Sequence, residues 1–178
     1  MVTTNLTELV EKAKAGNKNA FMDLVDTMKL QLYKTAIVKL GNEQDALDAV
    51  QEALYKAFSS IKNLRDSRFF KTWLIRIIMN ECYNIQKYKR RVVPLDSSLY
   101  QPELQHENNS VESMDIKILT NKLDVIYKEI IDLRYNHDLK FEDIAMVLDI
   151  PVGTVKSRLN RAHKLLREQL STHNIINS

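Results

Sequence analysis

Residues 141–167, FEDIAMVLDIPVGTVKSRLNRAHKLLR, restrict the fold of this chain more than any other stretch. The first eight residues predict a short amphipathic helix with three apolar residues on one side: Ile144, Ala145 and Leu148. Residues 149–151 interrupt it, and Pro151 can open a second helix because its missing N–H would be unpaired there. Apolar residues at intervals of three and four give that helix one buried face: Val152, Val155, Leu159, Ala162 and Leu166. Two helices joined by a tight turn predict a helix-turn-helix.

The outer side of the second helix is polar and basic. It carries two pairs four residues apart, Lys156 with Asn160 and Ser157 with Arg161. Residues 114–149 hold eight acidic and five basic residues, whereas residues 150–170 hold one acidic and five basic. An ordinary helical hairpin with a solvated polar face has the same periodicity. The concentration of positive charge favours DNA binding instead, with this helix reading base edges in the major groove.

The preceding sequence is patterned as helices throughout. Apolar stripes predict four helices over residues 5–16, 19–40, 42–59 and 69–89, with Gly41 closing the second and Asn42 capping the third. Residues 63–68 read as a polar loop, in which Asp66 or Ser67 can cap the next helix. Together these elements predict a four-helix N-terminal domain.

Composition changes abruptly at residue 92. Residues 92–113 contain two prolines, four serines, four acids and no Lys or Arg, which predicts an extended linker. Helices at 114–123 and 125–135 then complete a smaller domain with the helix-turn-helix. The expected fold is all-α: two small helical domains, 1–91 and 114–178, joined by the acidic linker.

Several classes of function are disfavoured by composition. No apolar run approaches the ~20 residues of a membrane span and no secretory signal begins the chain, so we expect a cytoplasmic protein without membrane insertion. The one cysteine, Cys82, is expected to be a buried apolar residue. The four histidines show no ligand spacing and are expected at the surface or in loops: His106, His137, His163 and His173. With no catalytic constellation, we expect neither an enzyme nor a cofactor or metal site.

The helix over 69–89 mixes aromatic and basic residues. Trp73 and Tyr83 stand among Lys71, Arg76 and Lys87, and residues 1–91 hold sixteen basic and ten acidic residues. Such aromatics are usually core. Interleaved with basic residues, they are also what single-stranded DNA binding requires.

Three segments taken together resemble the extracytoplasmic-function RNA polymerase sigma factors of the sigma-70 family. They are DALDAVQEALYKAF at 45–58, FFKTWLIRIIMN at 69–80 and LKFEDIAMVLDIPVGTVKSRLNRAHKLLREQL at 139–170. Their order and spacing fit, and the resemblance covers nearly the whole chain except the linker. It implies a region 2 helical bundle, a region 4 helix-turn-helix and a role in promoter-specific transcription initiation.

The resemblance also assigns residues and partners. Four residues match the helix that binds the β′ coiled coil of core RNA polymerase: Asp45, Asp48, Gln51 and Glu52. Nine match the specificity loop and the helix that reads and melts the −10 element: Leu64, Arg65, Asp66, Ser67, Arg68, Lys71, Trp73, Arg76 and Asn80. Seven match positions that meet the −35 element: Arg134, Thr154, Lys156, Ser157, Arg158, Asn160 and Arg161. Further implied partners are promoter DNA, the polymerase β flap and an anti-sigma factor.

The chain departs from the family pattern at a few positions. Leu47 stands where an acid is usual, Arg68 where a small residue is usual, and Asp138 where glycine is frequent. An aspartate tolerates a left-handed turn. The main alternative is a stand-alone helix-turn-helix regulator with a helical sensing or dimerisation domain, and a helical adaptor without DNA contact is a third.

Overall fold

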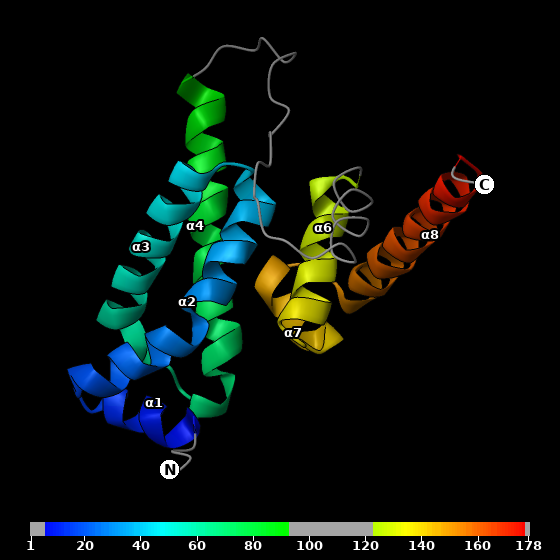
Figure 1. Cartoon of the computed structure of the whole chain (residues 1–178). Helices are drawn as coiled ribbons and strands as arrows, with labels where there is room; N and C mark the ends of the chain where they lie inside the picture. The colour runs from blue at the N-terminus through cyan, green and yellow to red at the C-terminus, as the bar shows by residue number, and fades with distance from the viewer. Residues whose placement is uncertain (1–5, 93–122, 177–178) are drawn as a thin grey trace. The chain divides into compact units, whose positions relative to one another are not determined.

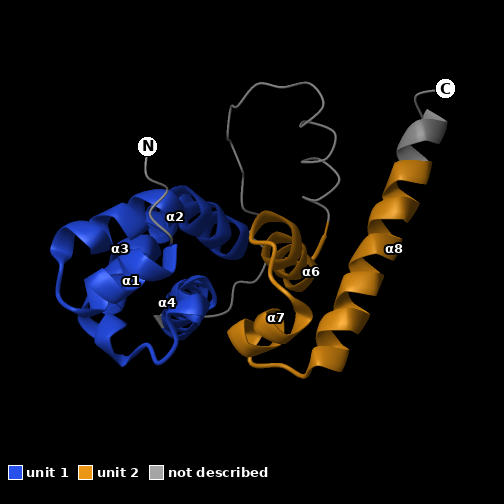
Figure 2. Ribbon diagram, turned by 90° about the horizontal axis from the view of Figure 1, so that it is seen from below, with its two compact units in different colours: residues 1–102 blue, residues 103–178 orange. Residues whose placement is uncertain are grey.

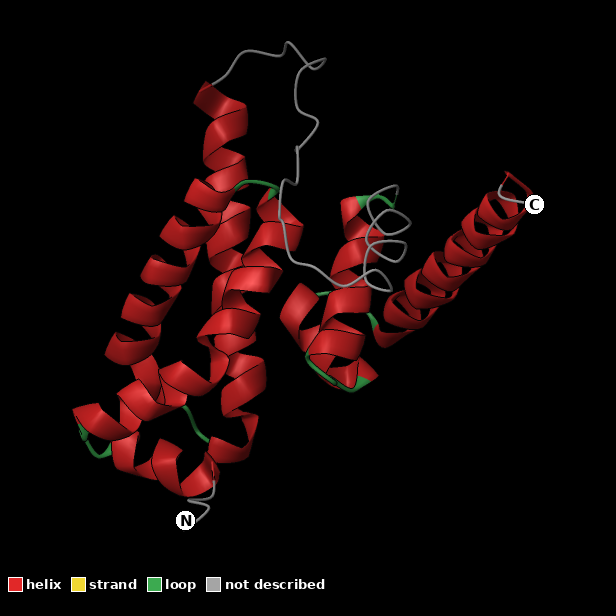
Figure 3. Ribbon diagram, viewed as in Figure 1, coloured by secondary structure: helices red, strands yellow, loops and turns green. Residues whose placement is uncertain are grey.

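The computed structural model describes residues 6–92 and 123–176, and within these two ranges it contains helices and turns but no strand (Figure 3). The chain divides into two compact units, Met1–Pro102 and Glu103–Ser178 (Figure 2). This confirms the predicted all-α fold of two helical domains. The predicted linker, apart from Val92 at the end of a helix, and the predicted helix at 114–123, apart from Leu123, lie outside the described residues.

The first unit is a helical bundle. Its helices are α1 (Leu6–Lys14), α2 (Lys18–Leu40), α3 (Glu43–Ser60) and α4 (Phe70–Val92), with two short 3-10 turns, η1 (Ile61–Asn63) and η2 (Ser67–Phe69), between α3 and α4 (Figure 1). Helices α2, α3 and α4 pack against one another in every pairing, and α1 packs on α2 and on both turns. The loop predicted at 63–68 therefore joins two short turns that both pack against α1.

Polar caps and one glycine set the limits of these helices. The Asn17 side chain accepts a hydrogen bond from the Ala20 N–H at 3.1 Å, and Asn42 accepts one from the Asp45 N–H at 2.8 Å. Gly41 has φ 76° and donates its N–H to the Ile37 carbonyl at 2.9 Å. A left-handed residue at this place favours glycine, so the predicted stop after α2 and the predicted cap of α3 are both confirmed.

The core of the first unit is formed by the predicted apolar stripes. The stripe of α2 is buried in full: Phe21, Leu24, Val25, Met28, Leu32, Ala36 and Leu40. Helix α3 buries four alanines, Ala46, Ala49, Ala53 and Ala57, whereas Val50 and Leu54 are partly exposed. Because helix separation depends on the side chains at the contact, this alanine row lets α3 lie close to its neighbours. Cys82 of α4 is buried, as predicted.

The second unit contains the helix-turn-helix. It is built from α6 (Val125–Ile131), the π-helical turn η3 (Asp132–Asn136), α7 (Phe141–Leu148) and α8 (Val152–Ile176) (Figure 1). Asp149 ends α7 with φ 53°, and the Pro151 carbonyl accepts from the Thr154 and Val155 N–H groups at 2.9 and 3.1 Å as α8 begins. Asp138 also lies in the left-handed region, with φ 50°, as its place in the sequence predicts.

Burial in this core adds two details to the sequence pattern. Helix α7 buries Ile144 and Val147, whereas Ala145 and Leu148 are partly buried. His137, expected at the surface or in a loop, lies in the segment between η3 and α7 but is only 1% exposed, with its Nε2 3.6 Å from the carboxylate of Asp132. It follows directly after η3, and a π turn holds more residues than an α turn and rotates the residues after it.

Candidate functional site

Most of the predicted DNA-contacting residues of α8 are exposed to solvent on its outer face. Lys156, Ser157, Asn160 and Arg161 are exposed, and Thr154 and Arg158 are partly exposed. The opposite face packs Val155, Leu159 and Ala162 into the core. Helix α8 therefore presents cations, an amide and a hydroxyl along one side, the groups that contact phosphates and base edges.

Arg134 occupies a different position from the other predicted −35 residues. Its Nη1 donates to the Leu139 carbonyl at 3.0 Å and lies 3.6 Å from Asp138, and its Cζ lies 5.6 Å from the centroid of the Phe141 ring. Lys156 Nζ lies 5.7 Å from the same ring. The two cations therefore share one aromatic ring, which joins η3 and α7 to the exposed face of α8.

A second contact fastens α8 to η3. The Tyr135 hydroxyl and His163 Nε2 are 2.8 Å apart, and the two ring centroids are 5.8 Å apart. Tyr135 precedes the helix-turn-helix and His163 lies within α8, so this contact ties the second helix of the motif to the element before it. No sequence pattern pairs these residues.

On α3, three of the four predicted polymerase-binding residues share an exposed face. Asp48, Gln51 and Glu52 follow the helical spacing of three and four residues and are all exposed. Asp45 differs: its side chain is 14% exposed and lies 2.5 Å from Lys89 Nζ of α4, and it also accepts from the Asn42 amide. Asp45 therefore ties the start of α3 to the end of α4, and its carboxylate is not presented on the outer face.

The loop between α3 and α4 exposes only part of its predicted contact set. Leu64 and Ser67 are buried, at 7% and 4% exposure, whereas Arg65 and Arg68 are exposed. Asp66 accepts from the Arg68 N–H at 2.9 Å and from Arg68 Nη2 at 2.6 Å, and these bonds lower the pKa of Asp66 to about 2. Leu64 and Ser67 hold the loop against the bundle, which leaves Arg65, Asp66 and Arg68 to face outward.

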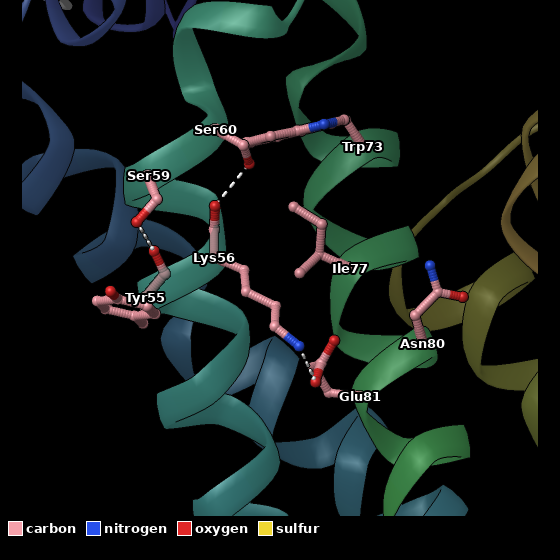
Figure 4. Close-up of a pocket in the computed structure, with 8 residues that line it drawn as sticks. All are labelled: Tyr55, Lys56, Ser59, Ser60, Trp73, Ile77, Asn80 and Glu81. Atoms are coloured by element: carbon pink, nitrogen blue, oxygen red, sulfur yellow. Dashed lines mark hydrogen bonds and ion pairs between the residues drawn. The ribbon is translucent and has the colours of Figure 1, made fainter.

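A shallow groove of about 430 Å³ runs between α3 and α4 (Figure 4). Its lining joins one residue set from each helix: Tyr55, Lys56, Ser59 and Ser60 from α3, and Trp73, Ile77, Asn80 and Glu81 from α4. Trp73 is partly exposed, and its ring lies 5.9 Å from that of Phe70 at a tilt of 40°. Trp73 thus rests on the core with one side while bordering the groove with the other.

The groove is crossed by an ion pair that sequence reasoning missed. Lys56 Nζ lies 2.6 Å from Glu81, which is 7% exposed (Figure 4). The hydrogen bond that Lys56 donates to the Glu81 carboxylate is the main reason why the pKa of Lys56 is raised. The available signal is that Glu81 stands next to Cys82 and follows the apolar residue Ile78 at helical spacing, since buried acids are almost always paired.

The remaining predicted −10 residues lie on the outer side of α4. Arg76 and Asn80 are exposed and Lys71 is partly exposed.

Among the described residues, no three His, Cys, Asp or Glu side chains are placed to hold a metal ion. None of the helices in 6–92 and 123–176 is long and apolar enough to cross a membrane.

Comparison with known proteins identifies the two units. Residues 24–92 match sigma-70 region 2, and residues 115–166 match sigma-70 region 4. The ECF RNA polymerase sigma factor SigW of Bacillus subtilis is 33% identical, with 90% of this chain and 94% of SigW covered. The chain belongs to the extracytoplasmic-function sigma factors of the sigma-70 family. The family predicted from the sequence is thereby confirmed, and the match to region 2 removes the stand-alone regulator as an alternative.

Other relatives agree with this assignment. The RNA polymerase sigma factor SigV of B. subtilis is 30% identical, with 92% of this chain and 99% of SigV covered. Among solved structures, the sigma factor RpoE from Bartonella quintana, in complex with the anti-sigma factor NepR, has a TM-score of 0.64 at 27% identity, covering 84% of this chain and 97% of RpoE. CnrH, in complex with the cytosolic domain of CnrY, has a TM-score of 0.69 at 24% identity and supports the fold, covering 94% of this chain and 97% of CnrH.

Proposed function

We propose that this sigma factor divides its work among three surfaces: α3 binds core RNA polymerase, α4 with its preceding loop opens and reads the −10 element, and α8 reads the −35 element. The observation that carries this proposal is the exposure of polar or basic residues on the outer sides of all three helices while their apolar sides are buried. The proposed work is binding and strand separation, without bond chemistry.

In region 4, the exposed residues of α8 would enter the major groove of the −35 element. Arg161 and Asn160 are suited to base edges, and Lys156 to phosphate or base. Arg134, already bonded to the Leu139 carbonyl, would act mainly by holding α7 and α8 in register. The polymerase β flap is the proposed protein partner of this region.

In region 2, Trp73 would support the opened −10 strand. Its ring borders an open groove and has Arg76 and Asn80 along the same helix. Stacking of a base on an aromatic ring contributes about 1–3 kcal/mol, which offsets part of the few kcal/mol needed to unstack it. Arg65 and Arg68, both exposed on the loop, would add contacts to the separated strand.

The outer face of α3 would dock on the β′ coiled coil through Asp48, Gln51 and Glu52. Since Asp45 is already paired with Lys89, we assign it a structural role beside this interface. RpoE, a similar structure, is bound to an anti-sigma factor, and we propose a partner of that kind for this chain as well. Such a partner would silence the protein by covering α3, α8 or both.

Charge reversal on α3 tests the docking surface. The double variant D48K/E52K should lose co-purification with core RNA polymerase while keeping its helical circular dichroism. The matched control is D23K/D26K, which reverses two exposed acids on α2 and should retain binding. Undiminished binding by folded D48K/E52K would remove α3 as the docking helix.

A further inference from the structure

Helix α1 holds the loop that precedes α4 through a small polar cluster. The Ser67 hydroxyl donates to the Glu11 carboxylate, and Lys14 Nζ lies 3.1 Å from the same carboxylate oxygen and 3.5 Å from the Ser67 oxygen. The bonds from Ser67 and Lys14 are the main reasons why the pKa of Glu11 is lowered. Glu11 is therefore an ionised acceptor for a hydroxyl that lies 56 residues away in the sequence.

The position of Ser67 makes this bond consequential. Ser67 begins η2, and its carbonyl accepts the N–H of Phe70, the first residue of α4. Its neighbours on either side, Asp66 and Arg68, are bonded to each other and face outward. Holding Ser67 therefore holds both the outward-facing Asp66–Arg68 pair and the start of the helix that carries Trp73.

The loop contains both buried side chains, which anchor it, and exposed side chains, which can contact DNA. Ser67 is 4% exposed and Leu64 is 7% exposed, so neither presents a side chain to an incoming strand. Arg65 lies between these two anchors and is exposed. A loop anchored at two points loses less conformational freedom when it binds than a free loop would.

We propose that Glu11 is a positioning residue for promoter reading: through Ser67 it fixes the loop that contacts the −10 strand, although it does not touch DNA itself. The inference rests on the proposed function of the loop. It assigns a role in promoter selectivity to α1, a helix that precedes the match to region 2 at residues 24–92. The competing explanation is that the cluster only stabilises the packing of α1 on the bundle.

The two explanations predict different ratios of the transcript yield from the native promoter to the yield from its −10 variants. Holoenzyme would be reconstituted from core polymerase and the full chain, and transcription measured on a promoter mapped with the wild-type chain and on each single-base variant of its −10 element. General destabilisation lowers transcription from all templates together. Loss of positioning lowers the ratio of native to variant templates, because the loop no longer holds one geometry.

The variants are E11A, E11Q, S67A and the double variant E11A/S67A. We expect E11A and S67A each to reduce the discrimination ratio roughly fivefold, about the effect of one partly exposed hydrogen bond. The double variant should lose no more than either single one, since both remove the same contact. E11Q, which keeps an acceptor oxygen for Ser67, should restore part of the ratio. The control is E8A, which removes an exposed pair with Lys12 at 2.7 Å on the same helix.

The outcomes are distinguishable. Discrimination by E11A equal to that of E8A would overturn the inference, and so would a lowered melting temperature with an unchanged ratio. Independent, additive losses for E11A and S67A would also contradict it, because the two residues would then act through different contacts. A wild-type holoenzyme that yields no promoter-specific transcript would remove the proposed function and this inference with it.

Discussion

Replacing Lys56 by methionine tests how the groove between α3 and α4 is held together. The change keeps the aliphatic stem and removes the ammonium group that lies 2.6 Å from Glu81. The Glu81 side chain is only 9% exposed, so K56M leaves a carboxylate without its cation in a poorly hydrated place. Removing one partner of a fully buried pair costs about 3–5 kcal/mol.

The cost in this protein should be smaller than that of a buried pair. The Lys56 side chain is 44% exposed, and the groove admits water to one side of the pair. Exposed pairs contribute about 0–1 kcal/mol, so we place K56M between the two limits at about 1.5–2 kcal/mol. With the urea dependence typical of a small domain, this loss lowers the unfolding midpoint by about 1 M.

Tryptophan fluorescence provides a suitable assay. The chain has one tryptophan, Trp73, and it lines the same groove, so its signal follows the first unit even if the second unfolds separately. K56R should unfold near the wild-type midpoint. K29M, which removes an exposed pair with Asp26 at 2.7 Å, should shift it by less than about 0.5 kcal/mol.

The double variant K56M/E81M tests the ion pair as a whole. With both charges gone and apolar side chains in their place, much of the stability lost in K56M should return. Unfolding of K56M at the wild-type midpoint would refute the reasoning, because Glu81 would then be adequately solvated without Lys56.

Three further predictions concern the proposed surfaces. W73A holoenzyme should transcribe poorly from duplex promoters and recover on a template already open at −10, whereas equal loss on both templates would return Trp73 to a purely structural role. R161A should weaken promoter binding by about 1–3 kcal/mol and relax base preference in the −35 element; a changed salt dependence alone would indicate a phosphate contact. Since the pKa of Asp66 is lowered from 3.8 to about 2, its stabilising bonds to Arg68 are fully present above pH 3.8 and are lost as the pH falls through 2. A carboxyl titration by NMR with a midpoint near 3.8 would contradict that bond.

The features that were predictable from the sequence are local ones. Gly41 and Asn42 set the boundary between α2 and α3 through bonds within a few residues, and the buried face of α8 follows helical spacing. The sequence therefore sufficed for the helices of the first unit and for which residues of α8 face outward.

The features that could not be predicted from the sequence depend on contacts between distant residues or on irregular backbone. Ser67 is buried and bonded to Glu11, which is 56 residues away, and Asp45 is paired with Lys89, which is 44 residues away. Spacing along one helix carries no information about either partner. His137 is buried directly after the π turn η3, where a hydrophobic periodicity that assumes the regular α-helical repeat does not apply.

Transcription reconstituted from purified core RNA polymerase and this chain, with start sites mapped across genomic DNA of the source organism, tests the central claim most directly. We predict discrete start sites that are absent with core alone, each preceded by shared −35 and −10 elements at a constant spacing. The same start sites with and without the chain, together with specific DNA binding by the chain in the absence of core, would contradict its assignment as a sigma factor.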